Sequence, residues 1–94
     1  MNLFEQNIRN ENVRALVDSG IENVREIISI NSSCIEFLES TSGVTPEEYD
    51  SWRVETFGGI PCLRTIKRKG LQEVARICRE TREMGFEALE ILGC

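Results

Sequence analysis

The stretch that decides the fold is residues 58–92, GGIPCLRTIKRKGLQEVARICRETREMGFEALEIL. It contains two of the four cysteines and most of the basic residues of the chain. Over residues 71–84, apolar side chains recur every three or four residues, which is typical of a helix with one buried face. We therefore predict an amphipathic helix there, whose buried face is made of Leu71, Val74, Ala75, Ile77, Cys78 and Met84.

Gly85 predicts the end of this helix. A glycine after the last helical residue readily takes the left-handed conformation, and Phe86 can then fold back onto the preceding turn. In the residues that follow, Glu87 and Glu90 are three positions apart, so a strand would place their carboxylates on opposite faces. We therefore predict a second short helix over residues 87–92.

The first 43 residues predict a series of short helices separated by polar residues and glycine. Asn10 or Asn12 can cap a helix that ends at Gly20. Another helix start is expected at Ser33, because Ser33 and Glu36 have the spacing of a capping box. The helix between these two has apolar residues at helical spacing, which are Ile21, Val24, Ile27 and Ile28.

Residues 45–48, Thr-Pro-Glu-Glu, are the clearest helix start in the chain. Thr45 suits the N-cap, Pro46 suits the first helical position, and Glu48 completes a capping box. The helix that begins here would place Tyr49 and Trp52 on one face.

Residues 51–67 have two interpretations. The alternation of apolar and polar residues on either side of Gly58 and Gly59 is typical of a β-hairpin. Pro61, however, would lie inside the second strand, where it cannot donate a backbone hydrogen bond. We favour helices, so the predicted fold class is mainly α, a compact bundle of five to six short helices. The alternative is an α+β fold with a β-hairpin at about residues 51–67 packed on helices.

Length and composition indicate a single small domain over residues 1–94, with an acidic helical front half (1–43) and a second half that carries the basic cluster (44–94). With 40% hydrophobic and 29% charged residues, the chain resembles an ordinary soluble globular protein. The first ten residues lack the apolar core of a signal peptide, and no apolar run approaches the roughly 20 residues that span a bilayer. We expect a cytoplasmic protein without a membrane segment.

Four cysteines stand at positions 34, 62, 78 and 94, with no Cys-x-x-Cys pair, and the chain has no histidine. We interpret the cysteines as reduced thiols that act as small hydrophobic residues. The alternatives are a four-cysteine metal site and a disulfide. Cys94, at the carboxyl end, is expected to be exposed and open to oxidation. Without histidine, Ser-His-Asp and Cys-His catalysis and most transition-metal sites are excluded, so the sequence predicts no enzyme, no metal and no cofactor.

Charge is divided unevenly along the chain. Residues 1–50 hold ten acidic and three basic residues, whereas residues 51–94 hold six acidic and eight basic ones. Seven of the eleven basic residues fall between positions 64 and 82. Some can pair with a glutamate four residues away on a helix, but four cannot, and these are Arg64, Lys67, Arg68 and Arg82. Either these side chains bind an acidic ligand or the acidic front half neutralises them.

The first helices resemble one repeat of the helix-hairpin-helix class, in which a Leu-x-x-x-Gly-Ile step is followed by a valine and an isoleucine. The resemblance implies a tight turn between two helices. Such modules carry a second glycine in that turn, where backbone amides meet DNA phosphates, and this chain has Glu22 there, which does not fit phosphate binding. The matching residues are Leu16, Gly20, Ile21, Val24 and Ile27.

We expect a small regulatory or inhibitory protein that binds a macromolecular partner, of the kind that phages and mobile elements often encode. The first expectation is a protein partner, which includes a second copy of the chain, and Tyr49 and Trp52 would anchor that interface if they are exposed. The alternative is a module that binds nucleic acid, a phosphate or a nucleotide through the basic cluster over residues 64–82. A cleft with two carboxylates, or with a cysteine of strongly shifted pKa, would instead indicate an enzyme.

Overall fold

The computed structural model describes residues 2–93 and contains no strand in that range. The prediction of a mainly α bundle is therefore confirmed, and the β-hairpin alternative is wrong. The five helices are α1 (Leu3–Ser19), α2 (Ile21–Ser40), α3 (Pro46–Phe57), α4 (Leu63–Lys69) and α5 (Leu71–Leu92).

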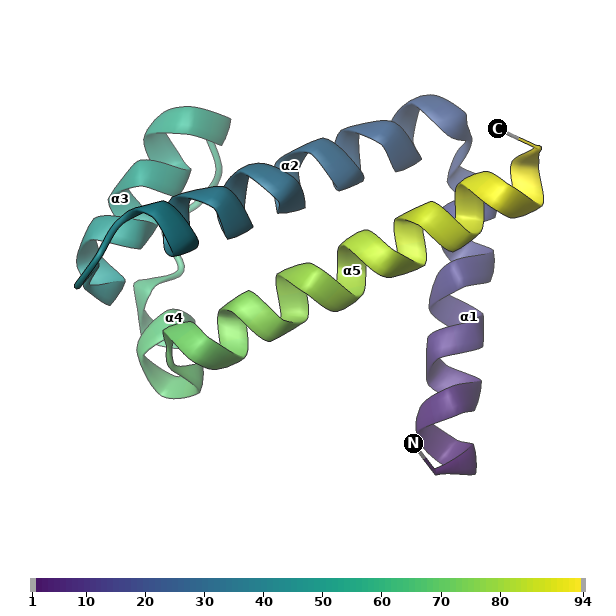
Figure 1. Cartoon of the computed structure of the whole chain (residues 1–94), viewed down its shortest axis with the longest axis horizontal. Coiled ribbons are helices and arrows are strands. Elements are labelled where there is room, and N and C mark those ends of the chain that lie inside the picture. Colours follow the sequence, from purple (N-terminus) through teal and green to yellow (C-terminus); the bar gives the residue numbers. More distant parts are fainter. Residues whose placement is uncertain (1, 94) are drawn as a thin grey trace.

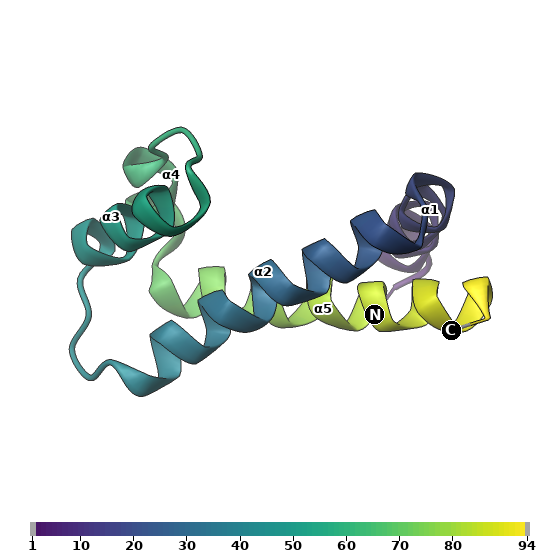
Figure 2. The same ribbon diagram turned by 90° about the horizontal axis from the view of Figure 1, so that it is seen from above.

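The long helices α2 and α5 form the frame of the molecule. They run antiparallel and pack against each other along most of their length (Figure 1). Helix α1 lies across one end of this pair, while α3 and α4 cover the other end, and the view from above shows the same arrangement (Figure 2). None of the helices within residues 2–93 combines the length and apolar character that a bilayer span requires.

Gly85 lies inside α5 and does not end it, so the predicted stop and the separate helix over 87–92 are wrong. Gly85 is buried against α2, where an added Cβ would come within 2.6 Å of Cγ1 of Ile28. Burial of one continuous face, with Cys78 before the glycine and Ala88 after it, outweighs the cost of a helical glycine, about 1 kcal/mol relative to alanine. The glycine therefore serves close helix packing.

Two further predicted helix starts are absent. Helix α2 continues through Ser33 because Cys34 and Ile35 bury its face there. Helix α1 begins at Leu3, capped by Asn2, whose Oδ1 accepts from the backbone N–H of Glu5 at 2.8 Å. The expected caps at residues 10 and 12 thus lie within one continuous helix. A capping residue permits a helix to begin, but nothing in these stretches forces the preceding helix to stop.

The predicted helix start at residues 45–48 and the predicted helix end at Gly20 are confirmed. The Thr45 hydroxyl accepts from the backbone N–H of Glu48 at 3.2 Å, and Pro46 is the first residue of α3. Gly20 ends α1, and Gly58 ends α3 in the left-handed region with φ of +70°. Helix α4 then begins at Leu63, after a five-residue loop.

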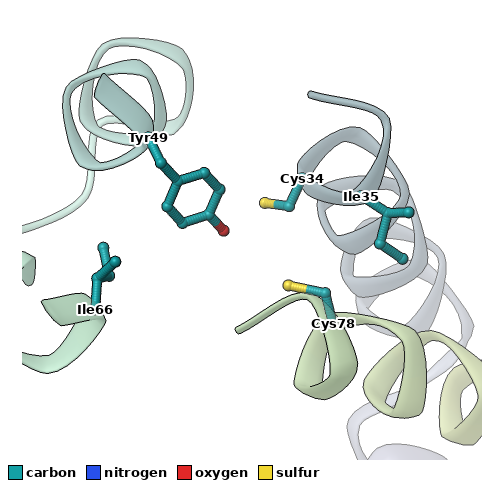
Figure 3. Close-up of a cluster of buried hydrophobic side chains, with 5 residues drawn as sticks. All are labelled: Cys34, Ile35, Tyr49, Ile66 and Cys78. Carbon is teal, nitrogen blue, oxygen red and sulfur yellow. The ribbon is translucent and has the colours of Figure 1, made fainter. Parts of the chain in front are cut away.

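The larger part of the core lies where four helices meet, between the α2/α5 frame and the α3–α4 end. Its buried side chains come from α2, α3, α4 and α5 and are Cys34, Ile35, Tyr49, Ile66 and Cys78 (Figure 3). At the α1 end, Val13, Val24 and Ala88 are buried. Two of the predicted small hydrophobic cysteines are therefore core residues.

Candidate functional site: a cysteine and tyrosine cluster beside a groove

A groove of about 390 Å³ opens between α2, α3, α4 and α5. Most of its lining is apolar, with Ile30, Ile66 and Val74 among the residues that form it. Five lining residues carry groups with distinct chemistry, namely three thiols, a phenol and a guanidinium. These residues are Cys34, Cys62, Cys78, Tyr49 and Arg53.

The antiparallel packing of α2 on α5 brings Cys34 and Cys78 together. The two sulfur atoms lie one above the other and point into the same space, toward which the hydroxyl of Tyr49 on α3 is also directed (Figure 3). Cys34 is 3% exposed and Cys78 is 7% exposed. The two thiols and the Tyr49 hydroxyl are close enough for the ionisation of each to affect the others. The three side chains thus form one buried polar cluster at the edge of the groove.

The cluster favours negative charge on Cys34. Hydrogen bonding from Cys78 lowers the pKa of Cys34, and burial opposes this effect. Hydrogen bonding from Tyr49 and the positive charge of Arg53 lower it further, so that the pKa of Cys34 is about 6. The hydrogen bonding with Cys34, together with burial, raises the pKa of Cys78. Burial and the hydrogen bond to Cys34 raise the pKa of Tyr49. Cys34 is therefore the group that ionises first, and the other two act as its donors.

Arg53 and Asp50 hold the side of the groove formed by the α3–α4 loop. Oδ1 of the buried Asp50 accepts from the backbone N–H of Cys62 at 3.0 Å, which ties the loop to α3. Burial opposes the charge on Arg53, but a hydrogen bond to Cys62 and the charges of Tyr49 and Asp50 raise its pKa overall. The guanidinium therefore stays positive beside the cysteines.

Tyr49 and Trp52 pack inside the protein. The ring of Trp52 is stacked on Phe37 of α2, with ring centroids 4.3 Å apart and planes inclined by 8°. Phe57 contacts Trp52 edge-on at 5.5 Å. Tyr49 is 1% exposed, so it presents no surface to a partner, while Trp52 is half-buried. These aromatic rings fasten α3 onto α2.

The structure groups three of the four predicted basic residues. Arg64, Lys67 and Arg68 are exposed on α4, and Nζ of Lys67 binds Oε1 of Glu47 on α3 at 2.7 Å. Hydrogen bonding to Lys67 lowers the pKa of Glu47. One member of the cluster is therefore neutralised, by a glutamate of the same half of the chain (44–94) and not by the acidic front half (1–43). Arg64 and Arg68 line a shallow depression with Thr65.

Arg82 lies apart from these three residues. It is eleven residues into α5, roughly 16 Å along the helix axis from Leu71. It is half-buried, and within residues 2–93 it forms no ion pair. Of the predicted glutamate pairs, Arg76 binds Glu80 at 2.6 Å and also binds Glu73.

A second surface of interest is the start of α1, which extends beyond the α2/α5 frame (Figure 1). Leu3 is 74% exposed and Phe4 is 73% exposed, while Ile8 is 42% exposed. Further along the helix, Val13 is buried against the rest of the protein. Helix α1 therefore leaves Leu3 and Phe4 of its first turn in solvent, whereas Ile8 lines a hollow against α5 together with Met84.

The sequence did not reveal the Cys34–Cys78 pair. Both cysteines could be placed on apolar faces, but which cysteines meet depends on the register of α2 on α5. The role of Asp50 was also missed, because a single carboxylate early in a helix is usually exposed. Within residues 2–93 no group of three or more His, Cys, Asp or Glu side chains is arranged to bind a metal ion. The expectation for Cys94 lies outside the described residues.

A scan of protein-family models and searches of curated proteins and of solved structures find no match to this chain. The function therefore has to be argued from the groups that the fold brings together. The groove contains one feature expected of an enzyme, a cysteine of strongly lowered pKa. Its sulfur is nearly enclosed, and the residues that line the groove provide no histidine or carboxylate to serve as a general base.

Proposed function

We propose that this protein is a small non-enzymatic regulator or inhibitor that binds a protein partner through the first half of α1. The observation that supports the proposal is the exposure of Leu3 and Phe4, 74% and 73%, on a helix that extends beyond the body. Burial of a large apolar side chain stabilises a complex by about 1.5–3 kcal/mol. Adjacent apolar side chains that contribute nothing to the core are typical of an interaction surface.

The binding face has the geometry of a helix that inserts into a groove. Phe4 and Ile8 are one turn apart and lie on the same side of α1. Val13, which is buried, and Val17, which is half-buried, lie on the opposite side of α1. A partner groove can therefore receive Phe4 and Ile8 while the second half of α1 stays packed on its own protein.

The charges on this half of α1 define the partner chemistry. Arg9 is bound to Glu87 of α5. Glu5 and Glu11 form no ion pair within residues 2–93. The free charge around Phe4 and Ile8 is therefore acidic, and we expect an apolar groove with a rim of lysine or arginine. The free thiols of the groove further favour a reducing compartment such as the cytoplasm.

A site-specific crosslink tests the proposal. A photoreactive amino acid replaces Phe4 in one variant and Ile60, 85% exposed at the other end of the molecule, in the matched control. The partner crosslinked at position 4 is then purified and its affinity is measured. We expect Phe4→Ser to weaken binding roughly thirtyfold, from about 2 kcal/mol of lost burial, and Ile60→Ser to leave it unchanged. Equal crosslinking at both positions, or equal affinity of both serine variants, would contradict the proposal.

One observation favours a second candidate function, the binding of a phosphate, nucleotide or nucleic acid. Arg64 and Arg68 line the same depression and form no ion pair within residues 2–93. Size-exclusion chromatography with light scattering, with and without a short DNA duplex at low and high salt, distinguishes the two functions. A salt-sensitive shift that Arg64→Gln removes supports this candidate. A dimer that Phe4→Ser dissociates would identify the partner of α1 as a second copy of the chain.

A further inference from the structure

Cys34 and Cys78 are poised for a reaction that their role as core residues does not require. They are 44 positions apart in the sequence, yet their sulfur atoms lie next to each other in the core, both directed toward the space in front of Tyr49. Both border the groove, which offers a route to them although little of either side chain is exposed. We propose that Cys34 and Cys78 are a redox dithiol. Hydrogen peroxide or an alkyl hydroperoxide oxidises the pair to a disulfide that joins α2 to α5.

The class of oxidant follows from the groove. Its lining next to the cysteines is mainly apolar, including Ile30, Ile66 and Ile77. A hydroperoxide is small and uncharged and can reach a nearly enclosed sulfur. A peptide disulfide such as oxidised glutathione is bulky and charged, and it would have to displace the helices to approach Cys34.

In the first step, the Cys34 thiolate attacks one oxygen of the hydroperoxide. A sulfur–oxygen bond forms and the oxygen–oxygen bond breaks, so the sulfur loses two electrons and the hydroperoxide gains them. The leaving alkoxide or hydroxide takes up a proton and departs as an alcohol or water. The product is a sulfenic acid on Cys34. Cys34 reacts first because Cys78 and Tyr49 both donate hydrogen bonds that favour its thiolate.

In the second step, Cys78 attacks the sulfur of the sulfenic acid. A sulfur–sulfur bond forms and the sulfur–oxygen bond breaks. The hydroxide that leaves combines with the proton of Cys78 to give water. In total, two thiols and one alkyl hydroperoxide yield one disulfide, one alcohol and one water, and with hydrogen peroxide the products are one disulfide and two waters. The two neighbouring sulfur atoms reach bonding distance through rotation of both side chains toward each other and small shifts of α2 against α5.

The test uses the Cys94→Ser protein, so that the only cysteines are Cys34, Cys62 and Cys78. The protein is treated with hydrogen peroxide or an alkyl hydroperoxide, blocked with iodoacetamide and cleaved with trypsin. The arginines of the sequence place each cysteine on a different tryptic peptide, residues 26–53, 54–64 and 77–79. We expect a disulfide between the first and third peptides, with Cys62 alkylated.

Three variants sharpen the test, each verified as helical by circular dichroism. Cys62→Ser, the matched control, should still form the disulfide between the same two peptides. Cys34→Ser should form none. Cys78→Ser should stop at a sulfenic acid on Cys34, which dimedone traps. The oxidised parent protein should also melt about 10 °C higher than the reduced one, because the disulfide closes a long loop.

Two results on the protein that keeps both Cys34 and Cys78 would overturn the proposal. One is full alkylation of Cys34 and Cys78 after peroxide treatment of the folded protein. The other is a disulfide from Cys34 to Cys62. Either result would leave Cys34 and Cys78 as packing residues and nothing more.

Discussion

Gly85 sets how closely α2 and α5 approach. Replacing it with alanine gains about 1 kcal/mol of helix propensity, but the new methyl group would lie 2.6 Å from Cγ1 of Ile28. Overpacking of this kind costs about 1–3 kcal/mol, so we expect Gly85→Ala to lower the free energy of unfolding by about 1 kcal/mol, measured by urea denaturation.

Two controls separate packing from the general effect of a glycine substitution. Gly59→Ala, in the α3–α4 loop with no atom within 4 Å of the added Cβ, should be nearly neutral. Ile28→Ala should lower the free energy of unfolding by less in the Gly85→Ala background than alone, since the new alanine methyl group and the Ile28 side chain compete for one space. Additive effects would mean that α2 and α5 move apart freely at this point.

The ionisation of Cys34 predicts how stability depends on pH. Its pKa falls from 9.0 to about 6 on folding. A group with a lower pKa in the folded state stabilises the fold above that pKa, and the contribution is complete above the unfolded value. The free energy of unfolding should therefore rise between pH 6 and 9, by at most about 1.4 kcal/mol per pH unit. At higher pH it should fall, because Cys78 has a raised pKa and ionises more readily when unfolded.

Urea denaturation across this pH range measures the effect, and Cys34→Ser is the control. The serine variant should lose the rise between pH 6 and 9 while it keeps the acid-induced unfolding that carboxylates cause. An unchanged rise in Cys34→Ser would assign the pH dependence to other groups and would leave Cys34 protonated at neutral pH.

At the scale of the helix, the link between α3 and α4 depends on Asp50. Its buried carboxylate accepts a hydrogen bond from the backbone of Cys62. A hydrogen bond to a charged group contributes about 1.5–3 kcal/mol, so Asp50→Ala should lower the free energy of unfolding by about 2 kcal/mol. Glu55→Ala, an exposed carboxylate on the same helix, is the matched control and should change it by less than about 0.5 kcal/mol. Equal effects would show that the loop is held by other contacts.

Helix limits were predictable where the backbone itself is constrained. Pro46 cannot lie in a helix interior, so the start of α3 follows from local chemistry. The end at Gly58 was left open by the sequence, because Gly58 and Gly59 fit a hairpin turn as well as a helix end. Ser33 and Gly85 carry the same kind of signal but lie inside long helices. The helix start predicted at Ser33 and the helix end predicted at Gly85 are absent because each long helix buries a continuous apolar face against residues distant in the sequence. This burial stabilises the longer helix.

For the candidate sites too, features that depend on local residue spacing could be predicted, whereas features that depend on packing between helices could not. Charge spacing alone shows that Arg64, Lys67 and Arg68 have no glutamate four residues away, but their exposure depends on how α4 packs. The meeting of Cys34 with Cys78 requires the register of α2 on α5, which Gly85 and Ile28 set and which no spacing within one helix reveals. The exposure of Phe4 also depends on how α1 packs, because its sequence fits a buried helix equally well.

At the scale of the whole molecule, the shape reflects the partial packing of α1. The radius of gyration is 14.2 Å, whereas about 12 Å is expected for a compact domain of this length. Figure 1 shows why, since the first half of α1 leaves the body formed by the other helices. The protein therefore carries apolar side chains on a part of the chain that its own fold does not use.

The last prediction is that these exposed apolar side chains contribute little to the stability of the fold. Phe4→Gln should change the free energy of unfolding by less than about 0.5 kcal/mol, because the side chain is 73% exposed. Val24→Ala, at a fully buried position of α2, should cost about 2 kcal/mol and shows that the assay detects lost packing. If Phe4→Gln were as costly as Val24→Ala, the start of α1 would be packed in solution and unavailable to a partner. If it is neutral, Phe4 is an apolar residue that folding does not need, which is the property that the proposed binding surface requires.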